Sequence, residues 1–185
     1  MTISCARPGI STEAMEGIVI GTAQMMHLRA IPAIELAGAA MFPEADLPQQ
    51  IRHRVTATAD LQNALDAGRL WTAVSGQGQV LGFAMADIVD DEAYLVEVDV
   101  LPDFGRRGIG NQLVKTVIAW ARESGFNALR LVTFRHIPWN APFYEKLGFS
   151  VVDRPEPGTE LAGLMDEERR AGINVVNRVA MLLTL

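Results

Sequence analysis

The sequence predicts an α/β (α+β) fold with a mixed, mostly antiparallel central sheet and helices on both faces. Three strand-like segments, at residues 70–74, 79–86 and 93–100, follow one another with no helix between them. A glycine-rich turn and a long helical pattern come only after the third, and strands and helices then alternate to the C-terminus. This order is typical of a mixed sheet, because a dinucleotide-binding domain would place its glycine turn after its first strand.

Length and composition indicate one globular domain. The chain has 185 residues, of which 49% are hydrophobic and 21% are charged, and this is enough to bury a sizeable core. We expect residues 27–185 to form the domain. Residues 1–26 show no clear periodicity, so we expect them to form a loosely ordered N-terminal extension.

Charge and residue usage exclude several classes of function. No apolar run approaches the roughly 18 residues of a membrane helix, and the N-terminus lacks a signal-peptide pattern, so we expect a cytoplasmic protein with no membrane partner. The net charge of −6 argues against nucleic-acid binding and favours a cationic partner such as an amine. Cys5 is the only cysteine, and His27, His53 and His136 share no metal-ligand spacing, so we expect no metal.

The segments before the sheet meander are predicted from breaker and cap residues. Residues 27–31 read as a short strand closed by Pro32, and a helix with one apolar face follows over residues 33–41. Asp60 is a good helix cap, and Gly68 ends the helix that it opens.

The segments after the glycine turn alternate between helix and strand. The long helix ends at Gly125, and the pattern then predicts a strand at 128–134, a helix opened by Pro138 and ended by Gly148, a strand at 149–152, a helix at 159–171 and a strand at 178–185. The terminal strand is apolar, and at a sheet edge it could pair with a second copy to form a homodimer.

The sequence from residue 93 to residue 114 carries the main functional signal. A strand ends at Pro102, the run Gly105-Arg106-Arg107-Gly108-Ile109-Gly110-Asn111 follows, and a helix begins there. Backbone N–H groups in the first turn of a helix lack partners, and glycines allow an anion to approach them, while arginines add charge-assisted donors. The pattern predicts a diphosphate site, and the alternative is an ordinary turn with two solvated arginines.

This stretch resembles the acyl-CoA binding motif of the GNAT superfamily of N-acyltransferases, Gln/Arg-x-x-Gly-x-Gly/Ala. Gly108 and Gly110 match its glycines, and Val98-Asp99-Val100 matches the strand that runs along the pantetheine arm. The opening position is Gly105 here, so Arg106 or Arg107 would supply the charge. The resemblance implies acetyl-CoA (coenzyme A) as cofactor, bound by Val98, Asp99, Val100, Gly105, Arg106, Arg107, Gly108, Ile109, Gly110, Asn111, Asn140 and Phe143.

A second family motif covers residues 143–149. Tyr144 matches the tyrosine that the resemblance assigns as general acid near the CoA sulfur, and the alternative is a packed core tyrosine. Many relatives carry an asparagine seven positions earlier, where this chain has Ile137. Asn140 lies four residues before Tyr144, on the same helical face, where it could contact the pantetheine amides, and the alternative is that it merely caps or decorates the start of the helix.

Glu97 is the predicted general base. It matches a carboxylate common at this place in the family, and Asp99 is a weaker substitute. Strict alternation puts Leu95, Glu97 and Asp99 on one face of the strand and the valines on the other. The alternative for Glu97 is a cross-strand ion pair.

These features together predict an acyl-CoA-dependent N-acetyltransferase. We expect direct attack by a primary amine in a ternary complex, because no cysteine is placed to form an acyl-enzyme, and we favour a small-molecule amine as acceptor. The alternatives are acetylation of a protein N-terminus or lysine, and a non-catalytic CoA-binding sensor.

Overall fold

The computed structural model describes residues 17–152 and 155–185, and its centre is a seven-stranded sheet of order β1-β2-β3-β4-β5-β7-β6. The β4–β5 pair is parallel, and the other neighbouring pairs are antiparallel. The strands are β1 (Val19–Thr22), β2 (Leu70–Val74), β3 (Val80–Val89), β4 (Glu92–Val100), β5 (Ala128–Phe134), β6 (Ser150–Val151) and β7 (Arg178–Thr184). The predicted fold class is confirmed.

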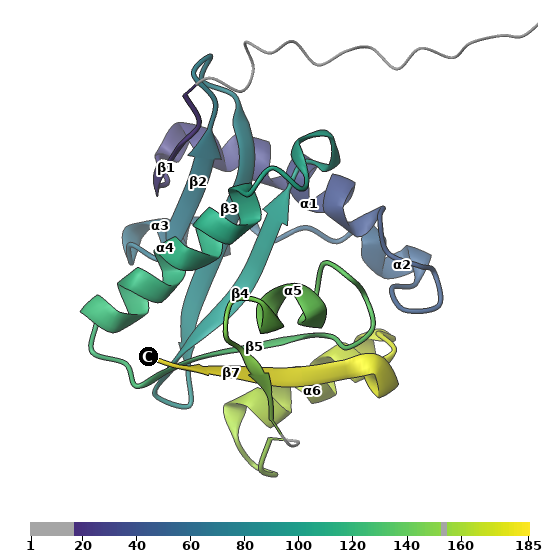
Figure 1. Ribbon diagram of the computed structural model, residues 1–185. Helices are drawn as coiled ribbons and strands as arrows, with labels where there is room; N and C mark the ends of the chain where they lie inside the picture. Colours follow the sequence, from purple (N-terminus) through teal and green to yellow (C-terminus); the bar gives the residue numbers. More distant parts are fainter. Residues whose placement is uncertain (1–16, 153–154) are drawn as a thin grey trace, which may run out of the picture.

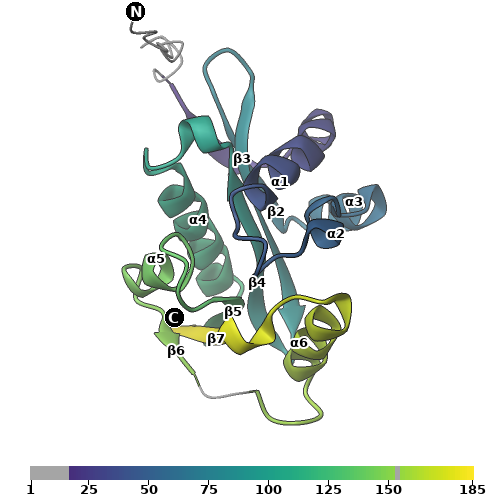
Figure 2. The ribbon, with the colours of Figure 1, turned by 90° about the vertical axis from the view of Figure 1, so that its right-hand side faces the viewer.

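Helices cover both faces of the sheet, as Figure 2 shows edge-on. The α-helices are α1 (Ile31–Ala39), α2 (Gln49–Arg52), α3 (Thr58–Asp66), α4 (Ile109–Glu123), α5 (Ala141–Glu145) and α6 (Glu160–Ala171), and the 3₁₀ helices are η2 (Met25–Ala30), η3 (Pro102–Phe104) and η4 (Val175–Asn177). Helices α4 and α5 lie on one face, and α1, α3 and α6 lie on the other (Figures 1 and 2).

Each face has its own core, built by the predicted periodicity. Leu113, Val114 and Val117 of α4 are fully buried against the sheet, with Leu95 and Leu131 in the same cluster. On the other face, α1 and α3 pack on Phe83 and Met85 of β3, while α6 packs on Tyr94 of β4. Because β3 is covered on both sides, its residues 80–86 form a nearly continuous apolar run.

The predicted strand at 27–31 is wrong, and the first strand lies earlier. Residues 25–30 form η2, in which the His27 ring accepts a hydrogen bond from the Gln24 N–H. Helix α1 follows directly, with Pro32 in its first turn. The strand β1 pairs along its whole length with β2. Residues 19–22 therefore belong to the sheet, although we expected an extension there, and residues 1–16, with Cys5, lie outside the described part.

The terminal strand does not lie at a sheet edge, so the basis for expecting a homodimer is wrong. The terminal strand β7 pairs with β5 on one side and with β6 on the other, so it is an interior strand and not an edge. The short β6 and the four-residue β1 are the two edges of the sheet.

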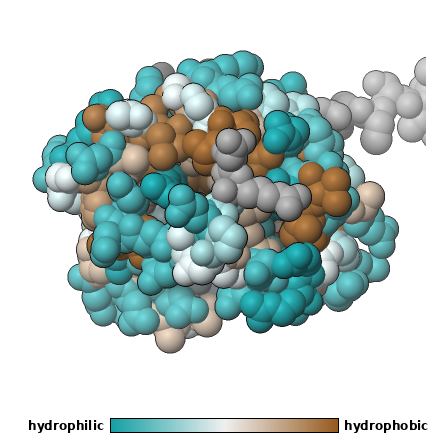
Figure 3. Space-filling view, turned by 90° about the horizontal axis from the view of Figure 1, so that it is seen from below, coloured by the Kyte–Doolittle hydropathy of each residue, from teal (hydrophilic) through white to brown (hydrophobic). Residues whose placement is uncertain are grey.

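The end of the molecule that carries α6 is mostly hydrophilic, with several apolar patches (Figure 3). Among the described residues, no helix has the length and apolar character needed to cross a membrane. The same residues contain no group of three or more His, Cys, Asp or Glu side chains able to hold a metal ion.

Candidate functional site

A cavity of about 750 Å³ lies where β4 and β5 separate. The two strands pair only at Ala93 and Tyr94 of β4 and then diverge, as Figure 1 shows. The cavity is lined by Gly38, Met41, Phe42, Val98, Asp99, Val100, Pro102, Phe104, Gly105, Arg106, Gly108, Ile109, Gly110, Asn111, Pro138, Trp139, Asn140, Phe143, Tyr144 and Lys146. Most of the predicted site residues therefore meet in one place, and Glu97 and Arg107 do not line the cavity.

A β-bulge in β4 accompanies this separation. Met85 pairs with Glu97 and Ala86 pairs with Leu95, so Val96 is an extra residue in the ladder. The bulge reverses the alternation of side chains. Leu95 packs on the α4 face, and Glu97 lies on the opposite face, so the predicted common face of these two residues is wrong.

The diverging edge of β4 exposes backbone groups to the cavity. Leu101 donates to the carbonyl of Leu81, and antiparallel pairing alternates, so the backbone groups of Asp99 also face β3. The N–H and C=O groups of Val98 and Val100 then point toward the gap left by β5. They can bond to an extended ligand in the way that a further strand would.

The glycine turn places the start of α4 at one end of the cavity. Gly108 is the N-cap in a left-handed conformation (φ 82°), and no side chain caps the helix. The N–H groups of the first turn, at Ile109, Gly110 and Asn111, therefore have no intrahelical partner and lie at the cavity wall. This arrangement is suited to a phosphate.

The two arginines of the turn have different positions. Arg106, which also has a left-handed backbone (φ 58°), lines the cavity, whereas the Arg107 guanidinium lies over the Phe104 ring at 5.3 Å from its centroid. Gly105 ends η3 and lines the same wall, without a side chain to contribute. Of the two predicted cations, Arg106 therefore lies at the cavity wall, where the first turn of α4 would receive an anion.

Asn140 has an unpartnered acceptor at the cavity. It is the N-cap residue of α5, but its side chain makes no capping hydrogen bond, so the capping alternative is wrong. Its Oδ1 atom is buried and has no hydrogen-bond partner. A buried acceptor without a partner is costly, and an amide N–H of a bound ligand would satisfy it.

Tyr144 is buried at the same cavity, one helical turn after Asn140. Its ring packs edge-on against Phe143 and Phe149, with centroids 5.1 and 5.6 Å apart. Burial, and then the negative charge of Asp99, raise the pKa of the Tyr144 hydroxyl. The phenol therefore keeps its proton at neutral pH and is available as a donor.

Three carboxylates meet on the face opposite α4. Glu97 is hydrogen-bonded to Asp99 and to Glu35, which is a buried residue of α1 with an exposed fraction of 4%. Glu35 accepts from the Thr56 hydroxyl at 2.5 Å and from the Thr56 N–H at 3.1 and 3.2 Å. Sequence reasoning missed Glu35, although a glutamate beside Ile34 on the apolar side of a helix was an available signal.

Glu97 and Asp99 both have raised pKa values. Burial, and then the charges of Asp99 and Glu35, raise the pKa of Glu97 well above its usual range. Burial also raises the pKa of Asp99 to about 7, with the hydrogen bond from Glu97 opposing the rise and the charge of Glu35 adding to it. At neutral pH, Asp99 can therefore both accept and release a proton.

The wall beyond Asp99 is apolar and is held by a polar network. Phe42 packs on Phe134 and Trp139, with ring centroids 5.5 and 6.0 Å apart. The loop after Phe42 carries Asp46, which is buried and bonds to His136 Nε2 and to Asn177 Nδ2, each at 3.0 Å. This network joins the loop to the segment before α5.

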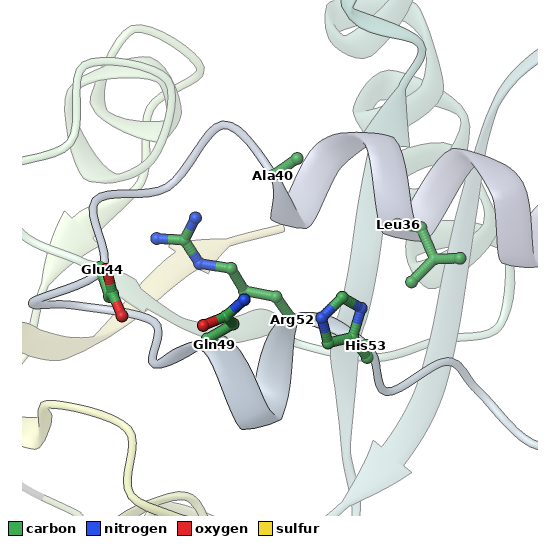
Figure 4. A pocket seen from close by; sticks show the side chains of 6 residues that line it. All are labelled: Leu36, Ala40, Glu44, Gln49, Arg52 and His53. Carbon is green, nitrogen blue, oxygen red and sulfur yellow. The ribbon is translucent and has the colours of Figure 1, made fainter.

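Arg52 holds the same loop from the other side. Its Nε donates to the Leu47 carbonyl at 2.8 Å, and its terminal nitrogen donates to the Phe42 carbonyl at 2.6 Å. Figure 4 shows its side chain beside a hollow of about 430 Å³ that is lined by Leu36, Ala40, Glu44, Gln49, Arg52 and His53. Because the Arg52 donors are used by backbone carbonyls, we assign this hollow a structural role.

The model of the acetyltransferase (GNAT) family matches residues 36–149, which is more than half of the chain. The chain belongs to this family. The matched region contains β2–β5, α4 and α5, and it includes every residue that lines the cavity. The predicted recognition is confirmed, and the family to which the chain belongs is one of acetyltransferases, in line with the predicted enzyme class.

Curated relatives match shorter stretches of this GNAT chain. The ribosomal protein bS18-alanine N-acetyltransferase of Haemophilus influenzae is 34% identical over 94 residues, which is 47% of this chain and 64% of the relative. The probable N-acetyltransferase camello of Xenopus tropicalis is 40% identical over 60 residues, 32% of this chain and 27% of the relative. The matches thus span less than two thirds of either relative.

Solved structures share the GNAT fold along most of the chain. The PaiA N-acetyltransferase of Thermoplasma acidophilum, in complex with coenzyme A, has a TM-score of 0.66 at 17% identity, over 91% of this chain and 99% of that one. The ribosomal-protein-S18-alanine N-acetyltransferase of Escherichia coli has a TM-score of 0.62 at 20% identity, over 91% and 94%. At these identities the likeness shows the fold alone.

Proposed function

We propose that this protein transfers the acetyl group of acetyl-CoA to a primary amine by direct attack in a ternary complex. The observation that carries the proposal is that one cavity is lined by the first turn of α4, by the phenol of Tyr144 and by the carboxylate of Asp99. Acyl transfer needs these parts together: donors for the diphosphate, an acid for the leaving thiolate and a base for the amine.

The residues at the cavity fit the cofactor. Gly108, Ile109, Gly110 and Asn111 would hold the diphosphate through backbone N–H groups, with Arg106 supplying positive charge. The free backbone edge of β4 and the orphan Oδ1 of Asn140 would bond the amides of the pantetheine arm. When bound, acetyl-CoA supplies the thioester, whose carbonyl would lie near the Val98 and Val100 amides.

Tyr144 is the proposed general acid. As the carbon–sulfur bond breaks, its hydroxyl would donate a proton to the leaving thiolate. Its raised pKa suits this role, because the phenol is protonated at neutral pH. Burial also excludes water, which would otherwise compete for the thiolate.

The acceptor would enter from the face that carries α1. The rim on that side is apolar, with Met41 and Trp139 exposed by 44% and 43% beside Phe42. We favour a small primary amine on an apolar body, because this rim would contact the body while the nitrogen approaches Asp99. The second candidate is a protein N-terminus, which the solvent-exposed rim and the activity of the two bS18-alanine N-acetyltransferases favour.

Calorimetric titration with acetyl-CoA tests the cofactor proposal. We expect micromolar binding of acetyl-CoA and none of NADH or ATP. A Cβ on Gly110 would lie 3.8 Å from Phe143 and 3.9 Å from Val100, so the larger side chain of Gly110→Leu would fill the cavity and weaken binding at least about tenfold. The control is Glu123→Gln, on the exposed side of the same helix. Unchanged affinity in Gly110→Leu would refute this site.

A thiol-release assay then separates the acceptor classes. Acetyl-CoA would be mixed with 2-phenylethylamine, with ethylamine and with a peptide that begins with alanine. A rate that is highest with 2-phenylethylamine supports the small apolar amine, and a rate that is highest with the peptide supports the protein N-terminus. Thiol release no faster than without an amine in all three, with tight acetyl-CoA binding, would indicate the non-catalytic sensor.

A further inference from the structure

We infer that Glu35 of α1 is a positioning residue for catalysis: it binds Glu97 so that Asp99, at the cavity wall, takes the proton of the incoming amine. The inference rests on the proposed function and deepens it. It replaces a single glutamate base with a unit of three carboxylates from two elements, and it assigns a role to a residue outside the recognisable motifs.

The cavity distinguishes Asp99 from Glu97. Asp99 lines the cavity together with Tyr144, whereas Glu97 does not line it and is hydrogen-bonded to both Asp99 and Glu35. A base must come within hydrogen-bond reach of the proton that it removes. The buried, unpartnered Oδ1 of Asn140 in the same cavity is independent evidence that a ligand binds there.

Helix α1 is built to receive the Asp99 carboxylate. A Cβ on Gly38 would lie 2.9 Å from both carboxylate oxygens of Asp99, so only a glycine leaves this space. Glu35 comes one helical turn earlier, on the same face of α1. Thr56 fixes Glu35 with both its N–H and its hydroxyl. The helix therefore holds Asp99 by close packing and Glu97 by a hydrogen bond.

The groups that face Asp99 set its proton affinity. Helix α1 contributes Glu35, β4 contributes Glu97 and α5 contributes the phenol of Tyr144. The ion pairs formed within the described chain use other carboxylates, namely Asp46, Asp87, Asp166 and Glu168. Burial raises the pKa of Asp99, the Glu97 hydroxyl donates to Asp99 and limits the rise, and the negative charge of Glu35 adds to the rise.

The proton balance of the step is complete. An N–H bond of the entering ammonium breaks, its electron pair stays on nitrogen, and the proton goes to Asp99. The neutral amine attacks the thioester carbon, the carbon–sulfur bond breaks, and Tyr144 protonates the thiolate. A second proton then leaves nitrogen to restore Tyr144, and Asp99 releases its proton to water. One amide, one thiol and one proton are formed.

The first test is the pH dependence of kcat/KM, measured with acetyl-CoA and the fastest amine of the panel above. Asp99 must be ionised to act, so the wild-type rate rises with pH through about 7. We expect Asp99→Asn to lose about 100-fold or more. We expect Glu35→Gln to move the midpoint of the rise to lower pH, because a like charge is removed, whereas a purely structural role would lower the curve without moving it.

Glu123→Gln is the matched control, since it removes an exposed carboxylate from α4. Two results would overturn the inference. One is an unmoved midpoint in Glu35→Gln. The other is an Asp99→Asn enzyme that works within about twofold of wild type while Glu97→Gln is inactive, since Glu97 would then be the base itself.

A second measurement keeps folding and cofactor binding separate from the inference. Carboxyl ¹³C resonances of the folded protein, followed from pH 4 to 9, report the titration of Asp99 with no acceptor present. We expect its midpoint to fall in Glu35→Gln and to stay fixed in Glu123→Gln, and a fixed midpoint in both would contradict us. If the wild-type protein did not bind acetyl-CoA, the proposed function itself would be wrong.

Discussion

The two ends of the cavity are built in different ways. The end proposed to bind the diphosphate is one continuous stretch, residues 105–111, and it offers backbone N–H groups together with the side chain of Arg106. The end proposed for the acceptor brings together Glu35, Thr56 and Asp99 from separate elements, and it offers carboxylates held by side-chain contacts. The first end depends on local backbone conformation and the second on tertiary packing, so substitutions should affect binding at one end and proton transfer at the other.

The largest effect is expected from a substitution of Tyr144, at the point where the two ends of the cavity meet. Tyr144→Phe keeps the contacts with Phe143 and Phe149 but removes the hydroxyl. We expect turnover to fall about 100-fold, since general acid catalysis commonly contributes that much, with little change in acetyl-CoA affinity. Thiol release and calorimetry measure the two effects. Unchanged turnover under conditions in which chemistry limits the rate would remove the acid role.

A smaller effect should be confined to the acceptor end. Asp46→Ala leaves the donors of His136 and Asn177 without their shared acceptor, so we expect a loss of about 1–3 kcal/mol in unfolding free energy. We also expect a higher KM for the amine and an unchanged acetyl-CoA affinity. The control is Asp87→Ala, which breaks a partly exposed ion pair with Arg69 and should cost about 0–1 kcal/mol. Equal losses in chemical denaturation would count against the network.

The smallest expected effect tests whether Gly38 of α1 is needed to make room for Asp99. Gly163→Ala in α6 meets no atom within 4 Å, so we expect it to stabilise the protein by about 0.5–1 kcal/mol through helix propensity. Gly38→Ala has the same propensity gain but must displace Asp99, so we expect no gain in stability and a several-fold slower transfer. If thermal denaturation shows the same gain in both variants, Asp99 is not held by Gly38.

The same contrast explains what could be predicted from the sequence. The strands at 70–74 and 128–134 and the glycine turn were predicted correctly, because alternation, breakers and helix caps are local signals. The bulge at Val96 was not, since an extra residue shows only against the partner strand. Glu35 was missed for the same reason, because its partners Thr56 and Glu97 are distant in the chain and only the fold brings them together.

The extra residue at Val96 also decides to which face of the sheet each later side chain of β4 points. If β4 paired with β3 without a bulge, alternation would run through Val96 from Leu95, so that Val98 and Val100 would point to α1 and both acidic residues to α4. Apolar residues would then occupy the α1 side, and charges would enter the main core. The one-residue bulge therefore decides on which face of the sheet the carboxylates lie, and a deletion of Val96 would leave Glu97 opposite Met85, on its present face.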